Sequence, residues 1–294
     1  MLETISDNVE RFSWWVSISL FLVMAAYETL RPERAATIPA WRRWLGHFAL
    51  YAVGLLIVVQ FSPDRIGPWL VPADESRLPF SILRRIGGDV AVLVCGFLVM
   101  DLLIYSLHRI HHNMFTLWRF HSVHHSDTDV DATTTLRHHP VGFLVNAGAA
   151  TVVVVSLGLS AWVFPLYGLC SLIINMFQHI NGELPPWLDR TLRLVIVSPA
   201  MHRSHHSADP AHYDSNYGNI LSIWDRLLGT YRVLTPAQQQ AMVFGVPGYT
   251  EPRYAGFGWM LLLPFKLRRN GASRGAADET AREPLAQVEA AGSS

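Results

Sequence analysis

The sequence predicts an all-α integral membrane helical bundle, with a cytoplasmic helical cap that carries clustered histidines. Three observations lead to this fold class. Half of the 294 residues are hydrophobic and only 16% are charged, which is too apolar for an ordinary soluble domain. Apolar segments of membrane-spanning length recur along the chain, and the histidine clusters begin where these segments end. Metal-binding side chains are therefore expected at the membrane surface.

Four apolar regions are candidates for the membrane: 12–27, 45–61, 90–107 and 141–177. A spanning helix needs about 20 residues, so each of the first three predicts one helix. The fourth is too long for one span and just long enough for two. Because histidines flank it on both sides, we expect 141–178 to form a helical hairpin, spanning or re-entrant, that turns near 158–165. The sequence therefore predicts four or five membrane-embedded helices.

The charged flanks of the first apolar region indicate the orientation of the bundle. Four arginines follow it, namely Arg31, Arg34, Arg42 and Arg43. Positive charge marks cytoplasmic loops, so the third helix should return to the cytoplasm and deliver its histidines there. We expect a multi-pass protein whose site faces the cytoplasm.

The remaining chain divides by composition. We expect transmembrane helices in 1–100, a histidine-rich region including the hairpin in 101–250, an interfacial segment in 251–269 and a disordered tail in 270–294. The interfacial segment is too short to span and ends in basic residues that could face lipid headgroups. The tail is rich in Ala, Gly, Ser and Glu, a composition typical of disorder.

The pattern H-x-x-H-H occurs three times: His108/His111/His112, His121/His124/His125 and His202/His205/His206. On a helix, positions i, i+3 and i+4 share one face, so each box presents two or three imidazoles in one direction. Neutral imidazole suits zinc, iron, copper and nickel. Eight or more such ligands exceed the capacity of one ion, so their number predicts a two-metal site.

Alternative roles for the boxes fit the sequence less well. A pH-sensing cluster without metal would place many repelling charges together once protonated. The zinc-protease pattern H-E-x-x-H is absent, and Cys95 and Cys170 lie inside apolar segments, away from any zinc-binding pattern. The net charge of zero provides no field that would attract nucleic acid, so no nucleic-acid partner is expected. His47 is expected to be a lone histidine without a partner.

The segments "DLLIYSLHRIHH", "FHSVHHSDTDVDATTTLRHHP", "FQHINGELP" and "SPAMHRSHHSADPAHYDSNYGNILSIWDRLLGTY" resemble the sterol desaturase/fatty acid hydroxylase superfamily over 101–231. The resemblance implies an integral membrane, non-haem diiron oxygenase that uses O₂ to hydroxylate an acyl, alkyl or sterol-like carbon. It implies two iron ions as cofactor. Zinc, which competes strongly with ferrous iron for nitrogen ligands, is an expected contaminant of purified protein.

The resemblance also assigns the ligands. It implies metal binding by His108, His112, His121, His124, His125, His179, His202, His205 and His206. The first box of the family is H-x-x-x-H, so His111 is an extra histidine, expected behind the ligands. His139 matches a histidine common in the family and is also expected to support the ligands. His138 is expected to be a surface residue.

Two carboxylates are expected to support the ligands from behind. Asp101, Tyr105, His108 and His112 form one helical stripe, so Asp101 could accept the second N–H of a ligating histidine. Asp225 is expected to brace the last box together with Asn216 and Trp224, or to pair with a neighbouring arginine. Further carboxylates near the boxes could offset metal charge: Asp127, Asp129, Asp131, Glu183 and Asp214.

Hydroxylation is the expected reaction, but a desaturase would use the same ligands, and a non-enzymatic metal-binding membrane protein is a weaker alternative. The partners expected are the bilayer and a lipid substrate drawn from it. Electrons should come from a separate donor, either a cytochrome, a ferredoxin or a reductase. The chain shows neither a nucleotide-binding G-x-G-x-x-G nor ferredoxin cysteines.

Overall fold

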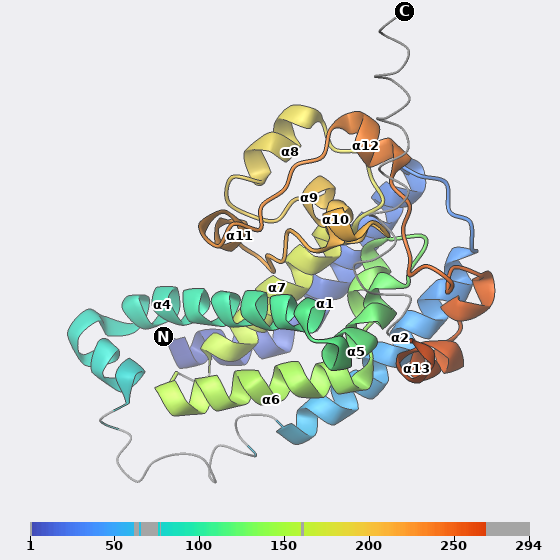
Figure 1. Ribbon diagram of the computed structural model, residues 1–294. Helices are drawn as coiled ribbons and strands as arrows, with labels where there is room; N and C mark the ends of the chain where they lie inside the picture. The colour runs from blue at the N-terminus through green and yellow to red at the C-terminus, as the bar shows by residue number, and fades with distance from the viewer. Residues whose placement is uncertain (1, 62–64, 66–75, 77, 160–161, 269–294) are drawn as a thin grey trace, which may run out of the picture.

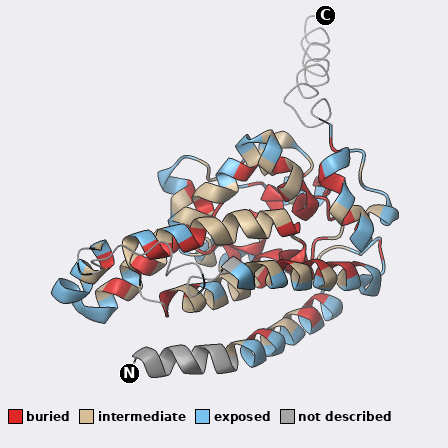
Figure 2. Ribbon diagram, turned by 90° about the horizontal axis from the view of Figure 1, so that it is seen from below, coloured by how far each residue is buried: buried red, intermediate tan, exposed pale blue. Residues whose placement is uncertain are grey.

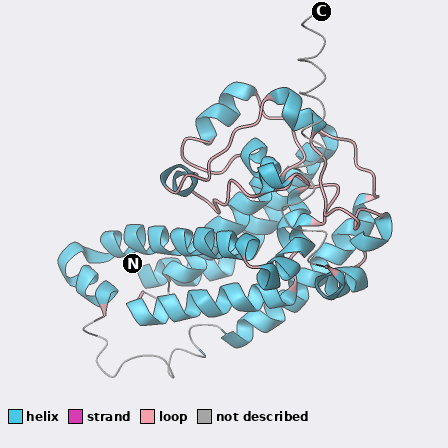
Figure 3. Cartoon of the chain, in the orientation of Figure 1, coloured by secondary structure: helices cyan, strands magenta, loops and turns pink. Residues whose placement is uncertain are grey.

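A computed structural model describes residues 2–61, 65, 76, 78–159 and 162–268, and over these residues every regular element is a helix (Figure 3). Between the helices, isolated bridges are the sole β-type pairings of this part of the chain. The predicted all-α class is confirmed. The tail expected to be disordered, 270–294, lies outside the described residues.

Five long helices form the body of the molecule: α1 (Leu2–Leu30), α2 (Ala40–Val58), α4 (Pro79–Asn113), α6 (Pro140–Leu157) and α7 (Val163–His179). Helix α2 packs against α6, α1 packs against α7, and α4 contacts both α6 and α7 (Figure 1). The expected hairpin corresponds to α6 and α7. Helix α6 ends where Gly158 adopts a left-handed conformation (φ 68°), a common way to terminate a helix.

Three helices contain windows long and apolar enough to cross a membrane: Ser13–Leu30, Pro79–Asn113 and Pro140–Leu157. Their outer surfaces carry large exposed apolar side chains, such as Trp15 (69% exposed) and Val90 (74%). Exposed apolar surface of this extent is unfavourable in water and favourable in lipid. These helices therefore support a membrane protein, whereas α2 and α7 do not meet the same criteria of length and hydropathy.

Helix α4 changes direction at Gly88, whose backbone (φ 69°, ψ −173°) is not helical. Glycine tolerates this conformation because it lacks a Cβ atom. The longer part of α4 after the kink enters the bundle and ends in the first histidine box, so the apolar helix delivers its histidines at one end.

Shorter helices gather around that end of the bundle (Figure 1). They are α5 (Phe115–His125), α8 (Pro186–Leu192), α9 (Pro199–His205), α10 (Pro210–Tyr213), α11 (Ile223–Leu227), α12 (Pro236–Ala241) and α13 (Phe257–Lys266), with 3₁₀ turns at Val59–Phe61, Ala132–Leu136 (η3) and Pro252–Ala255. Buried residues concentrate where these helices meet the long ones (Figure 2). The most enclosed part of the fold is therefore the part that holds the histidines.

Helix α13 covers part of the segment expected at the membrane interface. Its Met260 and Leu263 are buried against Leu50 of α2 and Val123 of α5. Its opposite face exposes Phe265, which is 62% accessible. The helix is thus apolar on both its protein face and its outer face, and its position at the membrane interface stays a prediction.

Candidate metal centre

The nine histidines expected as ligands form two neighbouring all-histidine clusters. The five-histidine cluster consists of His108, His112, His121, His125 and His205, and the four-histidine cluster consists of His124, His179, His202 and His206. Within each cluster the potential ligand atoms all lie within 4.8 Å of one another. No carboxylate belongs to either cluster among the described residues.

Local sequence accounts for how the helices present these rings. Helix α9 starts where the Ser198 hydroxyl accepts a hydrogen bond from the Met201 N–H, with Pro199 at its first position, both of which are strong start signals. His202 and His206 are then four residues apart and face one cluster, while His205 faces the other. Helix α5 divides its box in the same way. The two clusters therefore share α5 and α9.

Hydrogen bonds to backbone carbonyls fix the ring protonation of the five-histidine cluster. His108 Nδ1 lies 3.0 Å from the Tyr217 carbonyl oxygen, and His205 Nδ1 lies 2.7 Å from that of Ser215. A carbonyl only accepts, so both Nδ1 atoms carry the proton and both neutral rings have a lone pair on Nε2. Those two Nε2 atoms lie 2.9 Å apart. Two facing lone pairs repel, and a cation between them removes the repulsion.

In the four-histidine cluster, unprotonated Nε2 atoms also face one another. His179 Nδ1 lies 2.6 Å from the Asn175 carbonyl oxygen, so its Nε2 is also unprotonated. This Nε2 lies 2.9 to 3.2 Å from the Nε2 atoms of His124, His202 and His206. One lone pair cannot satisfy three such contacts. Two ligands at right angles on metal–nitrogen bonds of about 2.1 Å would be about 3.0 Å apart, so the spacing fits a bound metal ion.

Burial keeps the rings outside the long helices in the ligating, neutral form. It lowers the pKa of His205 to about 4, even though the Ser215 carbonyl favours the protonated ring. Burial, followed by repulsion from neighbouring histidines, lowers the pKa of His202 and His206 well below 6.5. The Nε2 atoms of these rings face one another within each cluster, at 2.9 to 3.2 Å. This convergent set of imidazole donors fits the metal that the resemblance implies.

Asp101 does not contact a ligating histidine, contrary to the expectation from its stripe. It accepts hydrogen bonds from the backbone N–H groups of Ile220 and Leu221, the Trp224 indole and the Tyr167 hydroxyl, at 2.9 to 3.1 Å. The reason is geometric, because the loop after α10 packs across α4 at this level. Asp101 therefore ties that loop to the helix bundle.

Asp225 stabilises the same loop at a point closer to the metal ligands. It does so through hydrogen bonds to the backbone, and no arginine among the described residues forms an ion pair with it. Its carboxylate accepts from the backbone N–H groups of Tyr217 (2.8 Å) and Gly218 (2.9 Å). The Tyr217 carbonyl in turn accepts the His108 proton. Asn216 braces the last box directly, since its amide donates to the Ser204 hydroxyl (2.8 Å). The carbonyls of Ser215 and Tyr217 are ligand supports that no side-chain pattern could have identified.

Gly218→Ala should lower both stability and activity. A Cβ atom at this position would lie 2.8 Å from Asp225 Oδ2, 2.9 Å from the Leu221 carbonyl oxygen and 2.7 Å from a Val197 methyl. Relieving these contacts must shift the loop that orients His108, at a cost of about 1–3 kcal/mol. Thermal unfolding and product formation measure the two effects. Gly258→Ala, where a Cβ meets nothing within 4 Å, is the matched control and should resemble the wild type.

The histidines outside the clusters also have defined places. His111 is buried, with its ring 5.5 Å from that of His121, and it lines the cavity described below. His139 caps α6 by accepting from the Val141 N–H (3.2 Å). His138 is not a surface residue as expected. Its ring stacks on His124 at 4.3 Å, because η3 turns the chain back under α5, and burial lowers its pKa to about 3.

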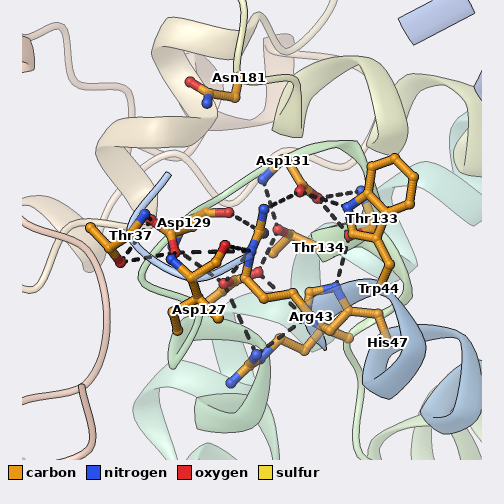
Figure 4. A network of polar contacts seen from close by, with 12 residues as sticks. Thr37, Arg43, Trp44, His47, Asp127, Asp129, Asp131, Thr133, Thr134 and Asn181 are labelled. Atoms are coloured by element: carbon orange, nitrogen blue, oxygen red, sulfur yellow. Dashed lines mark hydrogen bonds and ion pairs between the residues drawn. The ribbon is translucent and has the colours of Figure 1, made fainter. Parts of the chain in front are cut away.

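His47, expected to lack a partner, is completely buried in a polar network (Figure 4). Its Nδ1 lies 2.8 Å from the Thr133 hydroxyl, and its Nε2 lies 3.2 Å from Arg137 and 3.6 Å from Asp127. The expectation was wrong because these partners come from the segment after α5, about 90 residues away. The network joins α2 to the turn that follows the second box.

Charges from α2 and from that turn complete the network. Arg43 contacts Asp131 at 2.6 Å and lies 4.0 Å from Asp127 (Figure 4). Burial by itself would raise the pKa of Asp127, but Arg137, His47 and Arg43 outweigh it and bring the value to about 2. The carboxylates of this turn that were expected to offset metal charge are therefore engaged with arginines, and Asp129 likewise accepts from Thr37. Asp214 approaches a ligand more closely, at 3.5 Å from His112 Nδ1.

A cavity of about 310 Å³ leads from the histidines into the helix bundle. Its polar end includes His108, His121, His124 and His202, with His138 beside them. Its walls come from α2, α4, α6 and α7, and include Met100, Ile104, Phe143, Ala147, Ala150, Phe164 and Leu172. An apolar chain entering from the bilayer could thus reach the ligand atoms.

Comparison with known proteins is consistent with this geometry. The chain is 32% identical to the ornithine lipid hydroxylase OlsE of Rhizobium tropici over 59% of its own length and 50% of the relative's. It is 33% identical to the alkylglycerol monooxygenase of Danio rerio (46% and 29%) and 24% identical to the lathosterol oxidase of Homo sapiens (63% and 58%). The chain thus spans at most about half the length of the first two. No solved structure matches it.

The region that matches a known family is the region that holds the clusters. Residues 93–230 match the model of the fatty acid hydroxylase family, and they include all nine clustered histidines, the Asp101 anchor and the Asp225 brace. The motifs, the all-histidine clusters and the relatives agree, and residues 93–230 form a region of the fatty acid hydroxylase family.

Proposed function

We propose that the protein is an O₂-dependent membrane lipid hydroxylase with a diiron centre. The observation that carries the proposal is the pair of all-histidine clusters at the inner end of a cavity lined by apolar helices. One ion would be held by the five-histidine cluster and one by the four-histidine cluster. Nine nitrogen donors are too many for a single ion, and their division into two groups supports two.

Two iron ions bound here would supply the activation of O₂ and the removal of hydrogen from an unactivated C–H bond. The chain itself contributes orientation and exclusion of water. The carbonyls of Ser215, Tyr217 and Asn175 hold three rings with Nε2 toward the centre. The apolar walls leave room for an alkyl chain and disfavour water near the reacting carbon.

The substrate class is proposed from the cavity and the relatives together. The names of the relatives refer to an ornithine lipid, an alkylglycerol and lathosterol, and the cavity is lined largely by apolar side chains of α2, α4, α6 and α7. We infer a lipid carbon of acyl, alkyl or sterol-like type, delivered from the membrane. Electrons would come from a separate cytochrome, ferredoxin or reductase.

We propose the membrane topology on the same basis. One or both of helices α2 and α7 would join the three spanning candidates as membrane-embedded elements, giving four or five in all. Residues 1–100 would be the N-terminal part and 101–250 the catalytic region. Arg31, Arg34, Arg42 and Arg43 support a cytoplasmic position for the histidine end. Helix α13 would lie at the interface, with Lys266 toward the headgroups.

Supplying ¹⁸O₂ to membranes that contain the protein tests the reaction. Mass spectrometry should find a lipid that gains one ¹⁸O atom as a hydroxyl, in an amount that depends on the protein and on iron. A product lighter by two hydrogens and free of label would show desaturation and contradict the hydroxylase proposal. Membranes lacking the protein provide the control for spontaneous oxidation.

A further inference from the structure

The walls of the cavity are not uniformly apolar, and two of their polar groups have unused hydrogen-bonding capacity. One lies on α6 and the other on α7, and both line the cavity. The surrounding walls leave space there, since a Cβ atom at Gly142 or Gly168 would meet nothing within 4 Å. Polar groups in such a place cost free energy unless a ligand satisfies them.

The first group is the hydroxyl of Ser171 on α7. Its oxygen accepts two hydrogen bonds, from the side-chain amides of Asn175 (3.2 Å) and Asn219 (2.9 Å). A hydroxyl has two lone pairs and one proton, and both of these contacts are made to its acceptor side. Within the described residues its own proton has no acceptor, and Ser171 lines the cavity. Ser171 is therefore a donor available to a ligand.

The second group is the carboxamide of Asn146 on α6. Its Oδ1 atom is buried and has no hydrogen-bond partner among the described side chains and backbone groups. Asn146 also lines the cavity, on a helix that is otherwise strongly apolar. An unpaired buried amide oxygen is unfavourable, because it has lost its hydrogen bonds to water without replacement. Asn146 is therefore an acceptor available to a ligand.

The two groups lie at comparable positions along their helices. Asn146 follows His139 by seven residues on α6, and Ser171 precedes His179 by eight residues on α7. At 1.5 Å rise per residue these separations are about 10 and 12 Å of helix. His139 lines the cavity and His179 belongs to the four-histidine cluster, so both groups are about three helical turns along the cavity walls from the histidine end.

We propose that Asn146 and Ser171 bind an amide or hydroxyl group of the substrate, at a point on the cavity walls about 10 Å of helix away from the histidine end. An amide or a hydroxyl both donates and accepts, so it satisfies Asn146 Oδ1 and the Ser171 proton together. An ester or an ether only accepts and leaves Asn146 Oδ1 unpaired, and a hydrocarbon satisfies neither. The assignment of this group to a substrate rests on the proposed lipid hydroxylase function.

Four probes of matched chain length test the proposal: N-methylhexadecanamide, hexadecan-1-ol, methyl hexadecanoate and hexadecane. Each displaces tritiated N-methylhexadecanamide from the full-length protein in phosphatidylcholine nanodiscs, without turnover. The amide and the alcohol should displace the label on the order of tenfold more strongly than the ester and the hydrocarbon. The difference between the amide and the alcohol shows whether the site prefers an amide group or a hydroxyl group.

Asn146→Leu should abolish this preference. Ser156→Leu is the matched control on the same helix, because Ser156 is exposed, and it should preserve the preference. Equal displacement by all four probes in the wild type overturns the proposal, as does a preference that survives in Asn146→Leu. This binding measurement does not depend on the reaction. If the protein prefers the amide and the alcohol but forms no ¹⁸O-labelled product, the hydroxylase function is refuted and the proposed roles of Asn146 and Ser171 in binding are retained.

Discussion

Replacing His179 with alanine should abolish product formation and remove one of two bound metal ions. His179 is the only ligand from α7 in the described chain, and its Nε2 is within 3.2 Å of three other Nε2 atoms in the four-histidine cluster. Loss of a residue that only supports a ligand typically costs 10–100-fold, so loss of a ligand should exceed about 100-fold. Metal analysis of the purified protein and ¹⁸O incorporation measure the two effects.

His212→Ala is the control for this experiment. His212 belongs to neither cluster and lies on the short helix α10, with Nδ1 3.7 Å from Asp209. Its replacement should leave metal content and activity close to those of the wild type. Full activity in His179→Ala with two ions still bound would show that His179 is not a ligand.

Asp127→Ala should destabilise the protein by about 3–5 kcal/mol, the typical cost of leaving buried charge uncompensated. Asp127 is 1% exposed and lies 4.0 Å from both Arg43 and Arg137. It also accepts from the Thr134 hydroxyl at 2.8 Å. Removing the carboxylate leaves two buried guanidinium groups with less negative charge. Denaturant unfolding in mixed micelles measures the loss.

Asp127→Asn separates charge from hydrogen bonding, because the amide oxygen can still accept from Thr134. It should be less destabilising than Asp127→Ala. Glu251→Ala is the surface control, since Glu251 and its partner Arg253 are both more than half exposed, and exposed pairs contribute little. If Asp127→Ala unfolds at the same denaturant concentration as Glu251→Ala, the network does not stabilise the turn after α5.

The sequence predicted the helices and the clustered histidines because both depend on local periodicity. A spacing of four residues places His121 and His125 on one face of α5, but the division that turns His124 toward the neighbouring cluster was not predicted. Histidines on both flanks of the fourth apolar region predicted the hairpin, and the family resemblance implied His179 as a ligand. The hairpin argument needs only helix geometry and the thickness of a membrane.

The supporting residues could not be predicted in the same way. His47 and Arg137 meet across 90 residues, and nothing in either segment identifies its partner. Asp101 lies on the same face of α4 as His108 and His112, yet its carboxylate accepts hydrogen bonds from the backbone N–H groups of the loop that contains Ile220 and Leu221. Ser215 and Tyr217 act through backbone carbonyls, which every residue has. Long-range packing decides these contacts.

The five-histidine cluster has a consequence for how the protein is made. It joins His108 to His205, whose Nε2 atoms lie 2.9 Å apart, so the centre cannot exist until both have left the ribosome. At a synthesis rate of about 5–20 residues per second, the nearly one hundred intervening residues take roughly 5–20 seconds. During that interval α4 and α5 are present with exposed imidazoles. Iron delivered during translation would therefore meet only an incomplete ligand set, and stable loading belongs after synthesis of α9.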